Sequence, residues 1–460
     1  MSLADPISTF ADQRQHLLER YDGNVPRYTS YPTAVEFSNA VDEDTVASWL
    51  GAVSLEERLS VYVHIPFCKR LCWYCGCNTR AVRNTSLISD YIAFVGEELS
   101  LVEKALPGRP HAGAIHLGGG TPNMLSREDL GSLFRALRHV FNVSPGAEIA
   151  AELDPSVLTK EWVTAAAFHG LTRASIGVQD LSPHVQQAVN RIESFAIVER
   201  AAGWLRDAGI TSINLDLMYG LPRQRTQDVI ATLDKVLTLR PERLAMFGYA
   251  HVPWVKPHQK LIDQSELPGA AERLDQSEAA AAKLESEGYV RIGLDHFALP
   301  DDPLATAMAQ GRLRRNFQGY TADPHMTLIG LGASSISSLP QGYYQNDATE
   351  LGWRRRLQEG RLPVVRGIGL TDEDRFRGDI IETLMCQRAV DMGTMCASHG
   401  RPTTALAPER NALRAMARDG LVTLSGDTVA LTELGQPWLR SVARIFDARS
   451  GVQSRFSRVL

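Results

Sequence analysis

The sequence predicts an α/β protein built on a partial barrel of six strand–helix units, with an N-terminal arm and a mainly helical C-terminal domain. Between about residues 59 and 250, short β-branched runs alternate with helical patterns, which is typical of βαβ units around a parallel sheet. The length of 460 residues exceeds that of one ordinary domain. With 44% hydrophobic and 22% charged residues, the composition excludes disordered, collagen-like and coiled-coil proteins.

Six apolar runs are the candidate strands of the barrel. Right-handed crossovers would wind them into an open, partial barrel with its functional residues at the carboxyl ends of the strands. Polar or glycine-rich residues follow each run, as this arrangement requires. We expect the strands at residues 59–67, 112–119, 147–155, 173–180, 212–220 and 243–251.

The intervening helices carry start signals. Ser126, with Asp129 three residues later, predicts a capping box ahead of leucines and a phenylalanine at helical spacing. Ser182 before Pro183 predicts an N-cap followed by a proline at the first helical position. Both signals place a helix directly after a predicted strand.

The rest of the chain comprises an N-terminal arm, an extension of the barrel and a C-terminal domain. A helix is expected at 269–288, then a glycine-rich region at 314–340, and a small hairpin at 421–435 within a winged-helix-like C-terminal domain. The N-terminal arm is too polar and too rich in proline to be expected in a core. We therefore expect an arm and lead-in at 1–55, a barrel with an extension at 56–365, and the C-terminal domain at 366–460.

The charge balance limits the partners. The chain has 53 acidic and 48 basic residues, and its net charge of −5 gives no general attraction for nucleic acid or an anionic membrane. An anionic substrate must therefore be held by local arginines. No apolar stretch reaches 18 residues and the first twenty residues contain no apolar signal segment, so we expect a cytoplasmic protein with no membrane partner.

Four of the six cysteines lie within ten residues. Cys68, Cys72 and Cys75 follow the first predicted strand at C-x3-C-x2-C spacing, so their thiolates can converge on one inorganic core. A zinc site that includes Cys77 is an alternative, although structural zinc usually takes two ligand pairs from separated segments. Four buried, unreactive cysteines are a second alternative.

The cysteine motif, with Tyr74 as the aromatic residue before Cys75, resembles the signature of the radical S-adenosylmethionine superfamily. The surrounding sequence resembles the oxygen-independent coproporphyrinogen III oxidase family over nearly the whole chain. One departure is Val25, where the family usually has glycine before PRYTSYPT. The segments that carry the resemblance are PRYTSYPTA, YVHIPFCKRLCWYCGCN, HLGGGTPNML, AELDP, GVQDL with VNR, NLDLMYGLP, YAHVPW, DHFALPDD, RNFQGYT and FSRVL.

This resemblance implies a radical SAM partial (β/α)6 barrel and an anaerobic reaction in haem biosynthesis. The propionates on rings A and B of coproporphyrinogen III would become vinyl groups, giving protoporphyrinogen IX and consuming two S-adenosylmethionine molecules. The β-hydrogen of a propionate is too weakly acidic for a side-chain base, so a radical derived from the cofactor would begin the reaction. The resemblance further implies a low-potential electron donor and an electron acceptor, and we expect a monomer.

The resemblance also implies roles for individual residues. Cys68, Cys72 and Cys75 would hold a four-iron, four-sulfur cluster, and Cys77 would not. The glycine run at 118–120 could form only a tight turn, but its bare backbone also permits close approach of a ligand. One S-adenosylmethionine would contact Tyr62, Gly119 and Glu152. A second would contact Tyr74, Gly120, Thr121, Gln179, Arg191, Asp216, Ala250 and Ile336.

Other residues have weaker signals. We expect no side chain to act as a catalytic acid or base, and His64 is as compatible with a structural role as with a functional one. Because the substrate is a tetracarboxylate, arginine is the appropriate partner. The candidate substrate contacts are Arg27, Tyr28, Gln318 and Tyr320.

Two other functions compete. A haem-binding chaperone of the same family would keep the three-cysteine loop, but that branch generally has phenylalanine in place of Cys77 and lacks the arm. A radical enzyme that opens the haem ring would keep the cluster but diverge in the arm and in RNFQGYT. The arm, Cys77 and RNFQGYT therefore favour the oxidase.

Overall fold

The structure is a computed structural model that describes residues 10–449 and 456–459. Its centre is a sheet with seven adjacent parallel strands. All six predicted strands are confirmed, and a seventh lies on the other side of β1. In spatial order the parallel strands are β13 (Leu328–Leu331), β1 (Arg58–Ile65), β4 (His111–Gly119), β5 (Asn142–Leu153), β6 (Arg173–Gln179), β7 (Ser212–Tyr219) and β8 (Arg243–Gly248).

Antiparallel strands extend the sheet at both ends, which makes twelve strands in all. Beyond β8 lie β10 (His296–Ala298) and β9 (Val290–Ile292). Beyond β13 lie β14 (Ile336–Leu339), β15 (Gly342–Asn346) and β16 (Val364–Gly369). Two small pairs are separate: β2 (Phe67–Cys68) with β3 (Arg80–Ala81), and β11 (Arg314–Asn316) with β12 (Gly319–Thr321). The glycine-rich region at 314–340 thus contains several short strands that the sequence did not predict.

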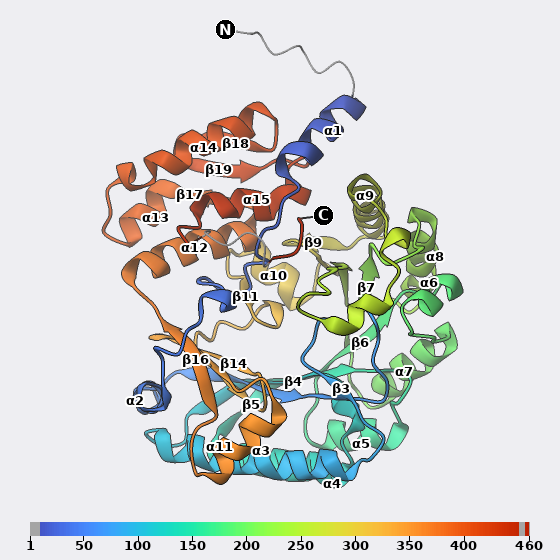
Figure 1. Cartoon of the computed structure of the whole chain (residues 1–460), viewed down its shortest axis with the longest axis vertical. Helices are drawn as coiled ribbons and strands as arrows, with labels where there is room; N and C mark the ends of the chain where they lie inside the picture. The colour runs from blue at the N-terminus through green and yellow to red at the C-terminus, as the bar shows by residue number, and fades with distance from the viewer. Residues whose placement is uncertain (1–9, 450–455, 460) are drawn as a thin grey trace.

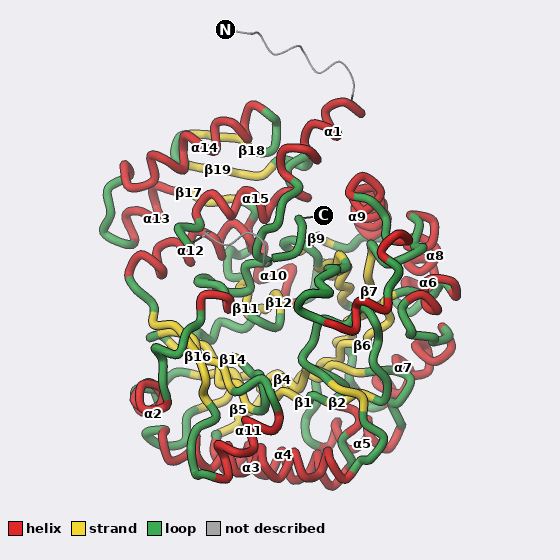
Figure 2. Tube along the Cα trace, viewed as in Figure 1, coloured by secondary structure: helices red, strands yellow, loops and turns green. Residues whose placement is uncertain are grey.

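Most helices of the barrel region lie on the outside of the curved sheet, whereas α10 (Pro303–Ala309) is drawn near the middle of the view (Figures 1 and 2). The predicted capping box is confirmed, because Ser126 and Asp129 exchange hydrogen bonds at the start of α4. Ser182 occupies the N-cap of α6 before Pro183, although within the described chain its hydroxyl makes no capping bond. The helices of this region are α3 (Ser86–Ala105), α4 (Arg127–Val140), α5 (Lys160–Phe168), α6 (Pro183–Ala188), α7 (Phe195–Asp207), α8 (Thr226–Leu237), α9 (Ala270–Ser286), α10 (Pro303–Ala309) and α11 (Glu350–Gln358).

The C-terminal region combines helices with a three-stranded sheet. The predicted hairpin is confirmed as β18 and β19, and β17 pairs with β19 on its other side. The elements are α12 (Asp372–Gln387), β17 (Ala389–Asp391), α13 (Met392–Ser398), α14 (Ala407–Arg418), β18 (Val422–Ser425), β19 (Thr428–Leu431) and α15 (Leu439–Ala443).

The expectation that the N-terminal arm contributes to no core is wrong. After α1 (Phe10–Tyr21), the side chains of Val25, Tyr28 and Tyr31 are 2%, 4% and 6% exposed and belong to the hydrophobic core of the C-terminal region. Farther on, α2 (Glu43–Gly51) packs into the barrel core. The sequence of the arm is polar and rich in proline, but its buried tyrosines pack with apolar residues far along the chain. Residues 1–9 of the predicted arm lie outside the described residues.

In the described part of the chain, no helix combines the length and the apolar composition that crossing a bilayer requires.

Candidate active site

The cysteine loop begins where β1 ends, at the carboxyl edge of the parallel sheet. Cys68, Cys72 and Cys75 line one cavity of about 170 Å³ together with Cys77. All four thiols are free of disulfides. The predicted convergence of the three spaced thiols on one site is therefore present in the fold.

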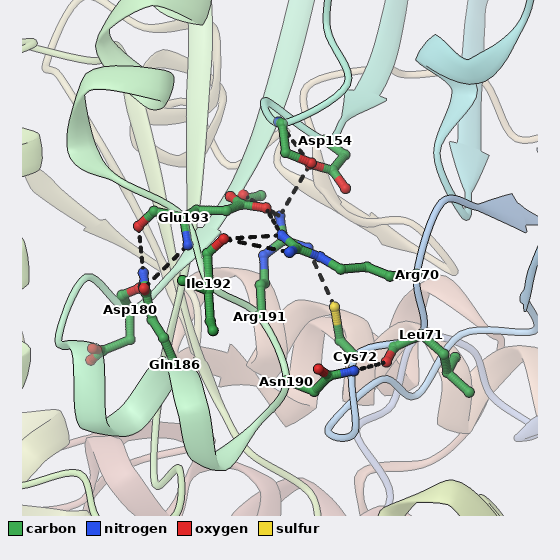
Figure 3. A network of polar contacts seen from close by, with 12 residues as sticks. Arg70, Leu71, Cys72, Asp154, Asp180, Gln186, Asn190, Arg191, Ile192 and Glu193 are labelled. Carbon is green, nitrogen blue, oxygen red and sulfur yellow. Dashed lines mark hydrogen bonds and ion pairs between the residues drawn. The ribbon is translucent and has the colours of Figure 1, made fainter.

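One side of this loop is fastened to the segment that follows α6 (Figure 3). The Asn190 amide donates to the Leu71 carbonyl at 3.1 Å, and the backbone N–H of Trp73 donates to the Val189 carbonyl at 3.0 Å. The guanidinium of Arg191 lies 3.6 Å from the Cys72 sulfur. These contacts hold the middle of the cysteine loop against the barrel.

Arg191 is the centre of a buried charge network. Its guanidinium donates to the Gly177 carbonyl at 2.6 Å and lies 3.3 Å from Glu193 and 3.9 Å from Asp154. Arg70 pairs with the same Glu193 at 2.7 Å. Burial raises the pKa of Glu193 to about 7, and the two arginines oppose that rise. The network fixes Arg191 in place beside the cysteines, and Figure 3 shows its members meeting from three segments.

The opposite side of the loop is held by the short 3-10 helix Pro257–Leu261 and the residue before it. The His258 ring bonds to the Cys75 carbonyl at 2.7 Å, and the Gln259 amide donates to the Tyr74 carbonyl at 3.0 Å. Lys256 donates to the Cys77 carbonyl at 3.0 Å. The loop is thus clamped from both sides through its backbone, which leaves the sulfurs directed at the cavity.

The thiols differ in acidity. The hydrogen bond from Cys77 lowers the pKa of Cys75 to about 7, while burial raises the pKa of Cys68.

Within residues 10–449 and 456–459, no three His, Cys, Asp or Glu side chains are close enough to share a single metal ion. The absence of such a group among these residues argues against a site for a single metal ion. It does not bear on a four-iron cluster, because each cysteine of such a cluster binds a different iron.

The glycine run at the end of β4 is required by packing. A Cβ on Gly118 would lie 2.9 Å from the Tyr62 ring, and one on Gly120 would lie 2.6 Å from the Phe67 carbonyl oxygen. Gly119 has φ of +108°, which favours glycine. The run therefore brings the end of β4 against the end of β1, and Gly119 and Gly120 line the cavity beside the cysteines.

Two carboxylates enter the cavity from adjacent parts of the sheet. Glu152 accepts the backbone N–H of Gly119 at 2.9 Å and lies 3.3 Å from the His116 ring. Although burial opposes it, these partners lower the pKa of Glu152. Asp216 accepts the Ser175 hydroxyl at 2.8 Å, and burial raises its pKa to about 6.

His64 is held in a structural position. Its Nε2 lies 2.8 Å from the Asn78 carbonyl oxygen and must donate there, so its Nδ1 accepts the Tyr62 hydroxyl at 3.0 Å. Burial lowers the pKa of His64. Both ring nitrogens are therefore occupied, and the ring is not placed as a free base.

The structure brings together most of the predicted site residues. Gln179 has φ of +69° at the end of β6, a strained conformation that turns the chain at the cavity. Tyr62 lies behind the glycine run. Ala250 lines a neighbouring cavity, and Ile336 on β14 lines neither of the two. Those that line the cysteine cavity are Cys68, Cys72, Tyr74, Cys75, Gly119, Gly120, Thr121, Glu152, Gln179, Arg191 and Asp216.

The four predicted substrate contacts are dispersed. Arg27 lines the neighbouring cavity with Ala250. The hydroxyl of Tyr28 donates to Asp447 at 3.0 Å, and that of Tyr320 donates to the Met385 carbonyl at 2.8 Å. Gln318 lines neither cavity in the described structure. Of these four residues, Arg27 alone reaches a cavity next to the cysteine site.

Six residues that hold the loop in place were not among the predicted site residues: Arg70, Asp154, Glu193, Lys256, His258 and Gln259. Two of them had a signal in the sequence: Asp154 lies at the carboxyl end of a predicted strand, and Glu193 stands two residues after Arg191.

The chemistry of the cavity lining fits an iron–sulfur cluster and a ligand that carries a carboxylate. Three thiols from one loop leave one iron of a four-iron cluster without a protein ligand. The Nε of Arg191 is buried at this cavity without a hydrogen-bond partner in the described chain, and is able to bind a carboxylate.

A model of the radical SAM superfamily matches residues 62–236, and a model of the HemN C-terminal domain matches residues 370–438. The protein is a radical SAM enzyme, which implies a four-iron, four-sulfur cluster and S-adenosylmethionine.

Relatives and a solved structure refine this class. The oxygen-independent coproporphyrinogen III oxidase of Bradyrhizobium diazoefficiens is 46% identical over 92% of this chain and 94% of the relative. An anaerobic coproporphyrinogen III oxidase of Cereibacter sphaeroides is 43% identical over 95% of this chain and 97% of its own. The solved coproporphyrinogen III oxidase of Escherichia coli, 36% identical, superposes with a TM-score of 0.88 over 92% of this chain and 97% of that one. The chain belongs to the family of oxygen-independent coproporphyrinogen III oxidases, and the chaperone and ring-opening alternatives are not favoured.

Proposed function

We propose that this enzyme converts the propionates on rings A and B of coproporphyrinogen III to vinyl groups, giving protoporphyrinogen IX in haem biosynthesis. The observation that carries the proposal is the three-thiol loop facing a cavity with Glu152, Asp216 and Arg191, in a chain that matches such oxidases along almost its whole length. Two S-adenosylmethionine molecules per substrate would supply one oxidation for each propionate.

The bound cluster and S-adenosylmethionine would supply a carbon radical strong enough to remove hydrogen from an unactivated carbon. The chain has the tasks of binding, orientation and shielding. Cys68, Cys72 and Cys75 would hold the cluster, while Arg191 would donate to a ligand carboxylate. No side chain is required as acid or base, and the occupied ring nitrogens of His64 support this assignment.

The two cofactor sites predicted from the resemblance have unequal support. Tyr62, Gly119 and Glu152 form one contiguous group, because Gly119 donates to Glu152 and the Tyr62 ring packs on the glycine run. In the second set, six residues share the cysteine cavity with the first, and Ala250 lies next to it. Ile336 is the least supported. The second set is Tyr74, Gly120, Thr121, Gln179, Arg191, Asp216, Ala250 and Ile336.

Further expectations accompany this function. Each decarboxylation removes two electrons from the substrate, so a low-potential electron donor and an external electron acceptor are both needed. We propose that the protein is a cytoplasmic monomer with domain boundaries at about residues 55 and 365. The later boundary is supported by two separate hydrophobic cores, one in the barrel and one in the C-terminal region.

An anaerobic product assay tests the proposal. The reconstituted protein is given coproporphyrinogen III, S-adenosylmethionine, a strong reductant and an electron acceptor, and the products are identified by mass spectrometry. We expect protoporphyrinogen IX and carbon dioxide. Release of 5′-deoxyadenosine with intact tetracarboxylate would contradict the proposal.

We expect Glu152→Ala to retain normal iron content but bind S-adenosylmethionine about ten- to a hundredfold more weakly, because a charge-assisted hydrogen bond is lost. Equilibrium dialysis with labelled cofactor measures this. Glu148→Ala is the control, since Glu148 lies on the same strand and pairs with Arg173 outside the cavity. Normal affinity in Glu152→Ala would return Glu152 to a structural role.

Cofactor binding should also depend on pH through Asp216. Because burial raises the pKa of Asp216 to about 6, the carboxylate is ionised above that pH and accepts hydrogen bonds from a ligand. Affinity for S-adenosylmethionine should therefore fall about tenfold as the pH drops below 6. Asp216→Asn should bind weakly throughout and show a flatter curve between about pH 5.5 and 7. Parallel pH curves for the two proteins would exclude Asp216 as the titrating group.

A further inference from the structure

A second cavity, of about 430 Å³, lies near the cysteine site and is rich in arginine. The Gln259 amide links the two, because it donates to the carbonyl of Tyr74, which lines the cysteine cavity, and to that of Ala250, which lines the second. This second cavity lies where the barrel, the arm, the C-terminal region and residues 456–459 meet. Asp216 of β7 lines the cysteine cavity, and Tyr219 at the end of the same strand lines this second cavity. Its size falls in the range of ligand-binding pockets. We call it the arginine cavity; its charged lining residues are Arg27, Arg273, Arg291, Asp295, Arg440 and Arg458.

The charges of the arginine cavity are unbalanced. Five arginines face one carboxylate in a chain whose net charge is −5. That carboxylate, Asp295, is already 2.8 Å from the His296 ring, and Arg458 pairs with Asp22 at 2.6 Å. The other four arginines form no ion pair with a carboxylate in the described part of the chain. Buried charges are normally paired, so the cavity lacks anionic partners.

Two of these arginines have unused donors. The Nε atoms of Arg273 and Arg291 are buried without a hydrogen-bond partner in the described structure. Arg273 is held by its donation to the Tyr249 carbonyl at 2.7 Å, whereas the guanidinium of Arg291 makes no hydrogen bond within the described residues. Burial lowers the pKa of both groups. An entering anion would restore favourable interactions to both.

Arg440 joins the walls of the cavity. It is 3% exposed and donates to the Pro26 carbonyl at 3.1 Å and the Arg458 carbonyl at 2.9 Å. Burial, with repulsion from Arg27, lowers the pKa of Arg440 to about 9. The acceptors of Arg440 are backbone carbonyls and the Ser457 hydroxyl, with no carboxylate among those described, so this buried cation raises the positive potential of the cavity further. Apolar surface from Met246, Leu294 and Phe297 lies beside these charges.

We propose that the arginine cavity binds the propionate carboxylates that are not reacting, with Arg273 and Arg291 as the carboxylate-binding residues beside Arg27. This inference rests on the proposed function and extends it to substrate positioning. The substrate has four carboxylates and loses two, so the others must be held while one propionate reaches the cysteine cavity. Arginine pairs with carboxylates in a bidentate geometry, and the apolar surface suits a pyrrole ring.

The same cavity must bind the substrate twice. After the first decarboxylation the molecule is a tricarboxylate with one vinyl group, and it must be placed again for the second. A weakened arginine cavity should therefore release more of this monovinyl tricarboxylate before the second step. A purely structural defect would not change the ratio of the two products.

The test uses coproporphyrin III, the stable oxidised tetracarboxylic acid, as a fluorescent probe of the anaerobically reconstituted protein. We expect Arg291→Gln to weaken its binding roughly ten- to a hundredfold, with Arg291→Lys in between. The tetramethyl ester of the probe should bind both proteins equally and weakly. Iron content and S-adenosylmethionine affinity should be unchanged. Arg361→Gln is the control, because Arg361 pairs with Glu43 away from this cavity.

Turnover supplies the second measurement. Arg291→Gln should raise KM more than it lowers kcat and should increase the released monovinyl fraction. We expect the same result for Arg273→Gln. If Arg273→Gln fails to fold, the Arg291→Gln variant alone decides the test, because the Arg291 guanidinium has no hydrogen bond in the described chain that the substitution would remove. Suppose that the wild type makes protoporphyrinogen and that Arg291→Gln shows unchanged probe binding, KM and product ratio. That result would overturn this inference and leave the proposed function standing. A wild type that neither binds nor converts the substrate would overturn the proposed function as well.

Discussion

Replacing Cys75 by serine is expected to abolish the iron–sulfur cluster and all product formation, and the same result is expected for Cys68 and Cys72. These three thiols line one cavity from a loop that is clamped through its backbone on both sides. A serine hydroxyl is a poor ligand for iron in such clusters, which bind thiolate. Iron and sulfide analysis after anaerobic reconstitution measures the loss.

Cys77→Ser provides the matched control within the loop. We expect it to keep most of the iron, because three thiolates leave the fourth iron open to S-adenosylmethionine. Cys396→Ser, in the core of the C-terminal region, should also retain a full cluster. Full iron in Cys75→Ser together with no iron in Cys77→Ser would show that the ligand assignment is wrong.

Deleting residues 1–36 is expected to leave an insoluble or largely unfolded protein. The deletion removes Leu17, Val25, Tyr28 and Tyr31 from the core of the C-terminal region. Each loss of a buried large apolar side chain costs about 2–5 kcal/mol, so the sum is comparable with the whole stability of a domain. Soluble yield and thermal unfolding of the purified protein measure the effect.

A point variant tests the packing role of the arm without removing the whole segment. Tyr31→Ala should lower the midpoint of thermal unfolding by several degrees, since it leaves a void in the same core. Thr33→Ala is the control, because the Thr33 side chain makes no capping hydrogen bond in the described structure. A soluble, cooperatively folded deletion protein would show that the arm is not needed for the core of the C-terminal region.

The parallel strands were predictable because their apolar residues follow strand patterns. The run 59–67 is nearly continuously apolar, as in a strand buried on both faces, whereas 212–220 alternates apolar residues with Ser212, Asn214 and Asp216. β13 was not predicted, because it has only four residues in a glycine-rich region. Its place beside β1 depends on contacts between segments far apart in the chain. The arm was misjudged for a related reason: whether Tyr28 is buried depends on a partner core that no local pattern reveals.

The candidate site was predictable where the spacing is local. Three cysteines within eight residues, and a glycine run after a strand, carry their signal in a few positions. The network around Arg191 was not predictable, because Arg70 and Asp154 reach it from distant loops. Likewise nothing in the sequence near Arg291 indicates that it faces the same cavity as Arg27 and Arg440.

The most direct test of the account follows hydrogen from substrate to cofactor. Coproporphyrinogen III deuterated at the β-carbons of its propionates is turned over anaerobically, and deuterium is measured in the 5′-deoxyadenosine that forms. We expect each 5′-deoxyadenosine to carry one deuterium, with two formed for every protoporphyrinogen IX. Formation of vinyl groups with unlabelled 5′-deoxyadenosine would contradict the account, because hydrogen would then leave the propionate by another route.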